Sequence, residues 1–117
     1  MKPVKYSFSE AEKVDLGTKI IYKYPTPTKD IDVAKMVLNG RHPKGSKTFV
    51  IEHTCSFIMS ITKGKGTVYA GDEKFTVGVG DVIFVPKENK FAVEGKLEYT
   101  TIDTPAYFRE QTEIIEA

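Results

Sequence analysis

The fold of this chain is decided by residues 45–95, GSKTFVIEHTCSFIMSITKGKGTVYAGDEKFTVGVGDVIFVPKENKFAVEG. Short runs of β-branched and aromatic residues alternate here with Gly-Lys-Gly, Gly-Asp and Gly-Val-Gly-Asp interruptions. This pattern is typical of consecutive antiparallel strands joined by tight turns. The sequence therefore predicts that this stretch forms the centre of an all-β domain.

Strands are also predicted before and after this stretch, and about nine are expected in all. They cover residues 19–24, 31–38, 48–53, 57–61, 67–70, 74–77, 81–85, 91–93 and 97–102. Turns are expected at Gly64-Lys65-Gly66 and at Gly71-Asp72. Short antiparallel strands with frequent turns predict a sandwich or a barrel, and closure into a barrel removes exposed strand edges.

A single domain is expected over residues 1–117, with the barrel core at about 19–103. The N-terminal arm, 1–18, shows little periodicity, so it is expected to be irregular or to form one helical turn near Ser9. The C-terminal tail, 104–117, is too apolar for a free tail. We expect it to pack along the barrel exterior or across a partner subunit.

Composition and charge exclude several classes of partner. The 117 residues carry a formal charge of +1, with lysines scattered along the chain, which gives no electrostatic reason to expect nucleic acid or an anionic membrane. There is no apolar run of transmembrane length and no signal-peptide pattern, so a cytoplasmic location is expected. The single cysteine, Cys55, excludes an internal disulfide framework and is expected to be a buried thiol.

The central stretch resembles the cupin family of small jelly-roll β-barrels. The first cupin motif, Gly-x5-His-x-His-x3-Glu-x6-Gly, aligns with Gly45, Ile51, His53, Phe57 and Gly64. The second, Gly-x5-Pro-x-Gly-x2-His-x3-Asn, aligns with Gly80, Pro86, Glu88, Phe91 and Gly95. The framework glycines and the proline fit, but of the three histidines and one glutamate that bind metal in the family only His53 remains. The resemblance implies an RmlC-like cupin barrel with a degenerate metal site.

The resemblance also implies which side chains point into the barrel. The motif positions place Ile51, His53, Phe57 and Phe91 inward, and the period of two along a strand adds Phe49, Met59 and Ile61. The same alternation places Glu52 outward, in a salt bridge. The expected interior is an apolar cavity with one histidine, His53. The candidate ligand-binding residues are Ile51, Phe57, Met59, Phe91, Tyr22 and Tyr24.

His53 is the candidate catalytic residue, with two interpretations open. It is either a core histidine bonded to the backbone or a neutral general base in a ligand cavity. His42 is expected to lie in a solvent-exposed Pro/Gly loop. With only two histidines in the chain we expect no metal and no other cofactor. An atypical metal site would have to combine His53 with His42 or Glu52.

Three functions remain open at this point. The first is binding of a small organic ligand without a metal, with or without isomerase- or epimerase-type catalysis by His53 and a tyrosine. The second is a non-catalytic ligand-sensing or accessory module, and the third is a metal-dependent oxygenase or isomerase with an atypical site. Whether the protein is an enzyme stays open, because one fold hosts many chemistries. A homodimer is expected, with Val50 and Ile58 among the outward positions.

Overall fold

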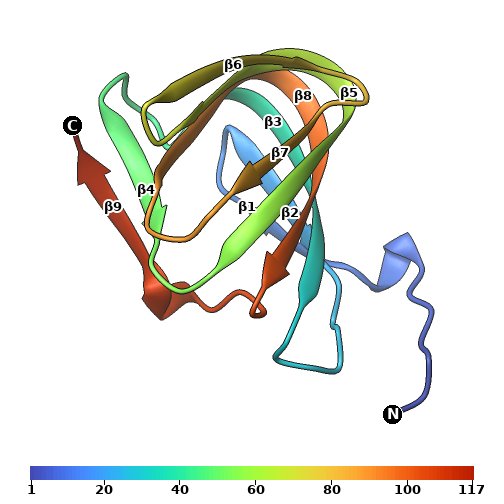
Figure 1. Ribbon diagram of the computed structural model, residues 1–117. Helices are drawn as coiled ribbons and strands as arrows, with labels where there is room; N and C mark the ends of the chain where they lie inside the picture. The colour runs from blue at the N-terminus through green and yellow to red at the C-terminus, as the bar shows by residue number, and fades with distance from the viewer.

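Nine antiparallel strands and two short 3-10 helices make up the computed structural model, which describes residues 1–117. The strands are β1 (Glu12–Asp15), β2 (Lys19–Lys23), β3 (Asp32–His42), β4 (Thr48–Glu52), β5 (Ser56–Ala70), β6 (Glu73–Gly78), β7 (Val82–Val85), β8 (Lys90–Thr104) and β9 (Thr112–Glu116). The helices are η1 (Phe8–Glu10) and η2 (Arg109–Gln111). The nine strands form one sheet that curls around an interior (Figure 1). The predicted all-β class is confirmed.

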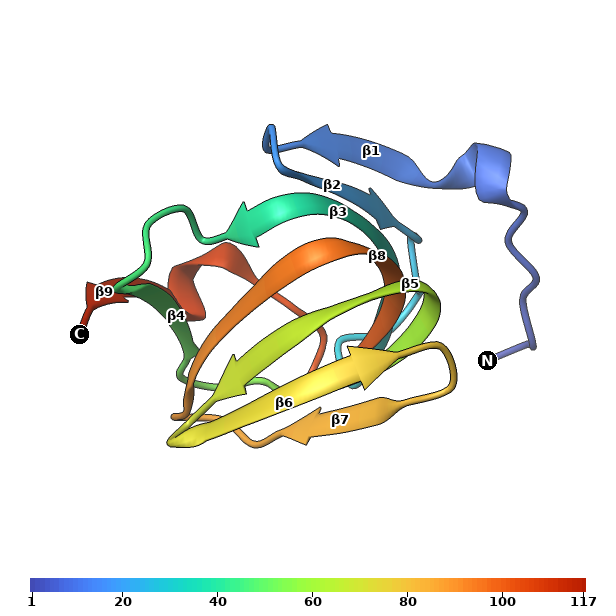
Figure 2. The same ribbon diagram turned by 90° about the horizontal axis from the view of Figure 1, so that it is seen from above.

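The sheet is organised around the long paired strands β5 and β8. From β8 the order continues through β3 and β2 to β1 on one side, and through β4 to β9 on the other. Strands β6 and β7 both pair with β5 and complete the opposite wall (Figure 2). The interior therefore lies between a β1–β2–β3 wall and a β5–β6–β7 wall, with β4 and β9 at one side.

The predicted turn at Gly64-Lys65-Gly66 is wrong, because β5 runs straight through these residues. Gly66 pairs directly with Gly95 of β8, and a Cβ on Gly95 would lie 2.8 Å from the Gly66 Cα. These glycines therefore allow two strongly curved strands to approach closely instead of reversing the chain. As a result, the predicted strands 57–61 and 67–70 merge into β5, and 91–93 and 97–102 merge into β8.

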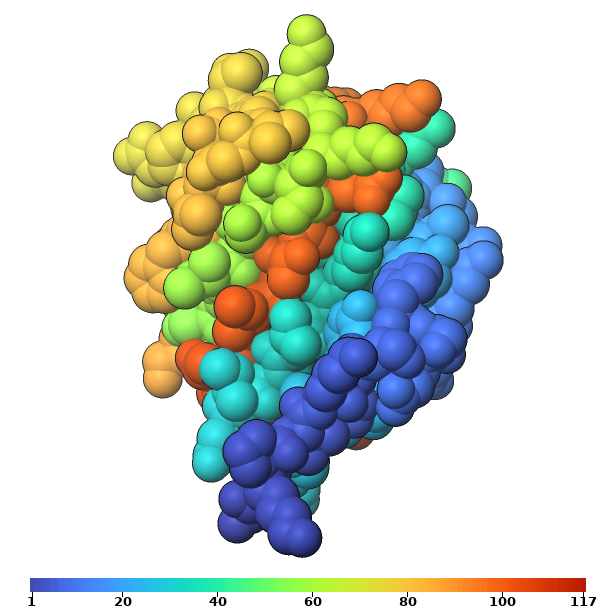
Figure 3. All heavy atoms as spheres, turned by 90° about the vertical axis from the view of Figure 1, so that its right-hand side faces the viewer, coloured from blue at the N-terminus to red at the C-terminus, as the bar shows by residue number.

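Both chain ends contain strands that the sequence did not predict. β1 pairs with β2 in the N-terminal arm, where η1 supplies the single helical turn expected near Ser9. Figure 3 shows the first residues of the arm lying along the outside of the barrel. The C-terminal tail packs on the barrel through β9, which pairs with β4. Neither helix has the length and hydropathy that crossing a membrane requires.

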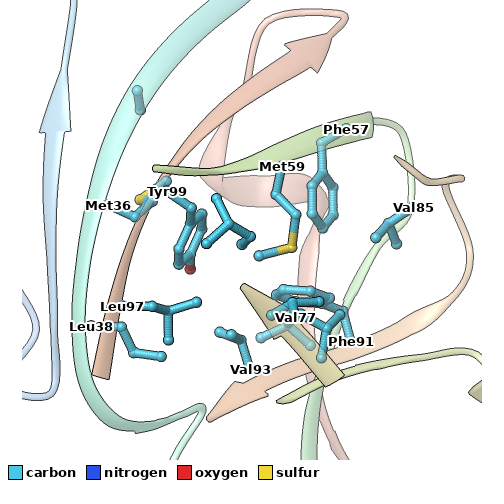
Figure 4. Close-up of a cluster of buried hydrophobic side chains, with 14 residues drawn as sticks. Met36, Leu38, Phe57, Met59, Val77, Val85, Phe91, Val93, Leu97 and Tyr99 are labelled. Carbon is cyan, nitrogen blue, oxygen red and sulfur yellow. The ribbon is translucent and has the colours of Figure 1, made fainter. Parts of the chain in front are cut away.

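A tightly packed core fills the part of the barrel enclosed by β5, β6, β7 and β8. Its fully buried members include Met59, Val68 and Val93, each 0% exposed (Figure 4). Phe57, Met59 and Ile61 are buried side by side on β5, so their predicted inward orientation is confirmed. Burial of apolar side chains is the main favourable contribution to the free energy of folding.

Candidate active site

A cavity of about 760 Å³ opens beside the packed core. Its walls come from β2, β3, β4 and β8 and from the C-terminal segment, and most of its lining residues are hydrophobic. The polar side chains that interrupt this apolar lining include five titratable groups carried by four strands, β2, β3, β4 and β8: Lys19, Asp32, His42, Glu52 and Asp103. An apolar cavity with a few convergent titratable groups is the usual form of a small-molecule site.

Strand β4 presents the opposite face from the one predicted. Val50 is buried, and it lines the cavity with Glu52, whereas Ile51 and His53 are not among the lining residues. The alternation of side chains along this strand was predicted correctly, but the face assigned to the barrel interior was the wrong one. Both faces of 48–53 carry apolar residues, so the phase depends on which partners satisfy Glu52 and His53. Those partners lie in distant parts of the chain.

His53 lies outside the cavity, with 42% of its side chain exposed. Its Nδ1 is 3.0 Å from the Glu88 carboxylate and its Nε2 is 2.8 Å from that of Glu113. The hydrogen bonds to Glu113 and Glu88 raise the pKa of His53. The inward position predicted for this histidine is therefore corrected: it joins the end of β4 to β9 and to the loop before β8.

His42 occupies the interior position instead. It is the last residue of β3, part-buried, and lines the cavity, which corrects its predicted exposure to solvent. Burial, and then the positive charges of Lys19 and Arg41, lower the pKa of His42 to about 4. The imidazole is therefore neutral at pH 7 and has a lone pair available to accept a proton.

Lys19 supplies a cation to the same cavity. It comes from β2, and burial lowers the pKa of its ammonium group to about 8, against the opposing effect of the carboxylates of Glu52 and Asp103. Near neutral pH this lysine is mostly protonated and is a much stronger proton donor than an ordinary lysine. Its charge acts on His42, so the two groups are electrostatically linked.

Asp32 and Asp103 form a carboxyl pair at the start of β3 and the end of β8. They face each other in the register of these strands, and the Asp32 carboxylate accepts a hydrogen bond from the Tyr107 backbone N–H at 2.8 Å. Burial, with the charges of Asp32 and Glu52, raises the pKa of Asp103 to about 7. Asp103 therefore exchanges its proton near neutral pH.

The C-terminal segment closes one side of the cavity around Glu52. The Glu52 carboxylate accepts hydrogen bonds from the Gln111 side-chain amide and, at 2.6 Å, from the Thr112 hydroxyl. Gln111 is buried and also accepts the backbone N–H groups of Thr54 and Cys55 at 3.0 and 3.1 Å. Glu52 was predicted to face outward, and this network is the physical reason that it does not.

The remaining predicted site residues are divided between the cavity, the core and the surface. Phe57 and Phe91 line the cavity and pack edge to face, with ring centroids 5.1 Å apart. Tyr24 also lines the cavity, and Met59 lies in the packed core. Tyr22 packs against Phe8, with ring centroids 4.8 Å apart, and is not among the lining residues.

Two further residues, Cys55 and Arg41, have structural roles. Cys55 is buried as predicted, and burial raises the pKa of its thiol to about 11, so it is not a thiolate at neutral pH. Arg41 donates to the backbone carbonyls of Pro43, Gly45 and Thr48 and so holds the loop after β3. Nowhere do three or more His, Cys, Asp or Glu side chains gather closely enough to hold a metal ion.

Lys19, Asp32 and Asp103 were not identified as site residues from the sequence, and His42 and Glu52 were considered only as partners of His53 in an atypical metal site. The two aspartates did leave a signal, since each ends an alternating apolar face: Asp32-x-Ala34-x-Met36, and Tyr99-x-Thr101-x-Asp103. A carboxylate in phase with buried positions indicates a polar group directed inward.

Comparison with known proteins places this geometry in a structural class. No protein-family model matches the chain. An uncharacterized protein of Methanocaldococcus jannaschii is 35% identical over 79 residues, which is 63% of each chain. The match thus spans less than two thirds of that relative's length.

Solved structures match over nearly the whole chain. A tyrosine-to-phenylalanine variant of Streptomyces Pac13 with uridine superimposes with a TM-score of 0.87 at 19% identity, covering 99% of this chain and 93% of its own. An RmlC-like cupin from Shewanella frigidimarina gives 0.71 at 18% identity, covering 89% and 93%. Oxalate decarboxylase from Bacillus subtilis gives 0.75 at 16% identity, covering 97% and 32%. The chain therefore has the cupin jelly-roll fold, as its sequence predicted. Among these neighbours, Pac13 is described as a nucleoside dehydratase.

Proposed function

We propose that this protein is a metal-independent acid–base enzyme that removes water from a small hydroxyl-bearing molecule bound in the barrel cavity. One observation carries the proposal: a neutral imidazole, His42, and an ammonium group of lowered pKa, Lys19, line the same apolar cavity. A catalytic base and a catalytic acid must both be in the correct protonation state at the working pH. These two residues meet that requirement between about pH 4 and pH 8.

The elimination can be written with these two groups alone. His42 takes a proton from a substrate carbon, the electron pair left behind forms the C=C bond, and the C–O bond to the neighbouring carbon breaks. The departing oxygen takes a proton from the Lys19 ammonium group and leaves as water. The imidazolium of His42 then returns a proton to the Lys19 amine, which restores the starting state.

The comparison with Pac13 supports both the reaction class and the ligand class. Pac13 is a nucleoside dehydratase, and its structures hold uridine in variants that replace a tyrosine or a histidine. The cavity described above has the volume of a typical small-molecule site. A nucleoside-type substrate is therefore the first class to test.

The two histidines of this chain provide a matched pair of variants. We expect His42→Gln to lower dehydration of the active nucleoside, followed by mass spectrometry as loss of one water, by about a hundredfold or more. His53→Gln should keep the dehydration rate within about twofold of wild type, because the His53 side chain lies outside the cavity and cannot reach a substrate there. Equal activity of the two variants would contradict the assignment of the base.

A second candidate function is ligand binding without turnover, and the largely apolar lining favours it. Calorimetry and turnover assays on the same wild-type preparation separate the two functions. Stoichiometric nucleoside binding with no product after prolonged incubation would show that the protein is a binding module and not a dehydratase.

The homodimer stays a prediction. Of its two expected outward residues, Ile58 is 40% exposed but Val50 is buried. Ile58 pairs with Phe84 of β7 and Ile102 of β8, and all three are exposed, so an apolar row crosses this outer face. Light scattering of wild type and Phe84→Lys should show a dimer that the charge converts to a monomer.

A further inference from the structure

Two buried hydroxyl groups on the inward face of β8 have no hydrogen-bond partner in the protein. They are the Tyr99 Oη and the Thr101 Oγ1. Tyr99 is 1% exposed and Thr101 is 6% exposed, and both line the cavity. Buried polar groups are nearly always hydrogen-bonded, because leaving them unpaired is unfavourable. Two in succession therefore need a physical explanation.

The neighbouring side chains cannot supply the missing partners. In the strand register Thr101 lies between Ala34 of β3 and Met59 of β5. Tyr99 lies between Met36 and Ile61 in the same way, and Figure 4 shows its hydroxyl among apolar side chains. None of these four side chains is an effective hydrogen-bonding group. Since both residues line the cavity, its occupant is the nearest remaining source of partners once the side chains around the hydroxyls adjust to it.

The same face of β8 continues into the carboxyl pair. Asp103 is the next inward residue after Thr101, and Asp32 faces it from β3. Successive inward positions on a strand are about 7 Å apart, so Tyr99, Thr101 and Asp103 form a polar wall about 13 Å long. Hydroxyl groups on a ligand suit this wall, because each can donate to a carboxylate and also accept from Tyr99 or Thr101.

Charge and aromatic packing restrict the ligand further. The cavity lining holds three acidic residues, Asp32, Glu52 and Asp103, and three basic ones, Lys19, Lys23 and Arg109. This balance favours a neutral ligand over a highly charged one. Phe57 lies beside Asp103 in the register, and its edge-to-face partner Phe91 extends an aromatic surface away from the polar wall.

We propose that Tyr99, Thr101 and the Asp32–Asp103 pair form a subsite for the hydroxyl groups of a neutral sugar ring, with the planar group attached to that ring packed on Phe57 and Phe91. The subsite rests on the proposed function only for the identity of the ligand as a nucleoside. None of its residues belongs to the acid–base pair: Lys19 comes from β2, and His42 lies at the opposite end of β3 from Asp32. Sugar recognition and proton transfer can therefore be tested separately.

The test measures binding of uridine and 2′,3′-dideoxyuridine by calorimetry, with cytidine and adenosine as further ribonucleoside probes. Tyr99→Phe and Thr101→Val each remove one hydroxyl and keep the side-chain shape. We expect each to weaken uridine binding about three- to tenfold and to leave binding of the dideoxynucleoside unchanged. Both variants should unfold at or above the wild-type temperature, since each removes an unpaired buried hydroxyl.

Thr100→Val is the matched control, because Thr100 is on the opposite face of the same strand and is not among the lining residues. It should leave both affinities unchanged. The subsite is overturned if wild type binds none of the ribonucleosides. It is also overturned if uridine affinity survives in Tyr99→Phe and Thr101→Val, as expected if only water contacts the hydroxyls. Equal losses of affinity for uridine and its dideoxy analogue in these variants would overturn it as well. Hydroxyl-dependent binding without any product in wild type would defeat the proposed enzyme and leave the subsite standing.

Discussion

The packed core and the cavity share one barrel interior, but the core is almost wholly apolar whereas the cavity contains titratable groups. Around Met59 and Val93 the interior is apolar and fully buried. Around His42, Lys19 and Asp103 the ordinary charged forms are disfavoured by burial, and the pKa of each group is shifted. The core therefore stabilises the fold, whereas the cavity lowers stability in a way that suits acid–base chemistry. Four predictions test this division.

The largest expected effect is a loss of packing. Met59→Ala should lower the free energy of unfolding by about 2–5 kcal/mol, because it opens a void among fully buried side chains. Met36→Ala is the matched control: Met36 is 9% exposed and already borders the cavity. Its loss should stay below about 2 kcal/mol, since much less new void is created. Equal losses in urea titrations would mean that the two regions are packed alike.

The next largest effect is a gain in stability when a charged residue of the cavity is replaced. The pKa of Asp103 is raised from 3.8 to about 7, so the folded state favours the protonated acid. Its contribution is complete below about pH 4 and is lost as the pH rises through about 7. Asp103→Asn should therefore stabilise the protein at pH 8 by about 1–3 kcal/mol, discounted for partial burial, and change little at pH 4. A loss at pH 8 would show that ionised Asp103 is stabilised by Lys19.

His42 should produce the opposite dependence on pH. Its pKa is lowered from 6.5 to about 4, so its stabilising contribution is complete above pH 6.5 and is lost as the pH falls through about 4. The free energy of unfolding should therefore fall by about 1–2 kcal/mol less in His42→Gln than in wild type as the pH is lowered from 6.5 to 4. Between pH 4 and 6.5 the contributions of His42 and Asp103 oppose each other in wild type. Only the single variants separate them, by urea titration across this range.

The sequence predicted the core better than the cavity, and the difference has a physical cause. The alternation of Phe57, Met59 and Ile61 depends on neighbours in the same strand, so its inward face could be predicted locally. The phase of β4 depends on Gln111 holding Glu52 inside and on Glu88 and Glu113 holding His53 outside. Those contacts join residues that are distant in the chain, and no local pattern specifies them.

The glycine-rich stretch was ambiguous for a similar reason. Gly64-Lys65-Gly66 has the composition of a turn, and a turn and a close strand crossing both require residues without a Cβ. The presence of Gly95 opposite Gly66 decides between them, but that pairing exists only once β5 and β8 are aligned. The number of strands agrees with the prediction because the two merged pairs of strands are offset by β1 and β9, which the sequence did not predict.

The smallest effect is expected at the exposed histidine, where polar groups are paired and hydrated. His53 lies between the carboxylates of Glu88 and Glu113, and these hydrogen bonds raise its pKa. Its contribution to stability should be complete below pH 6.5 and disappear as the pH rises through the raised value. Exposed ion pairs contribute little, so His53→Gln should change the unfolding midpoint much less than Met59→Ala. The change should be detectable at pH 6 and absent at pH 9, and Glu113→Gln should reproduce it because it removes the nearer carboxylate. If His53→Gln proved as damaging as Met59→Ala at both pH values, this cluster would be part of the structural core. The contrast between a cavity histidine of lowered pKa and a surface histidine that adds little stability would then fail.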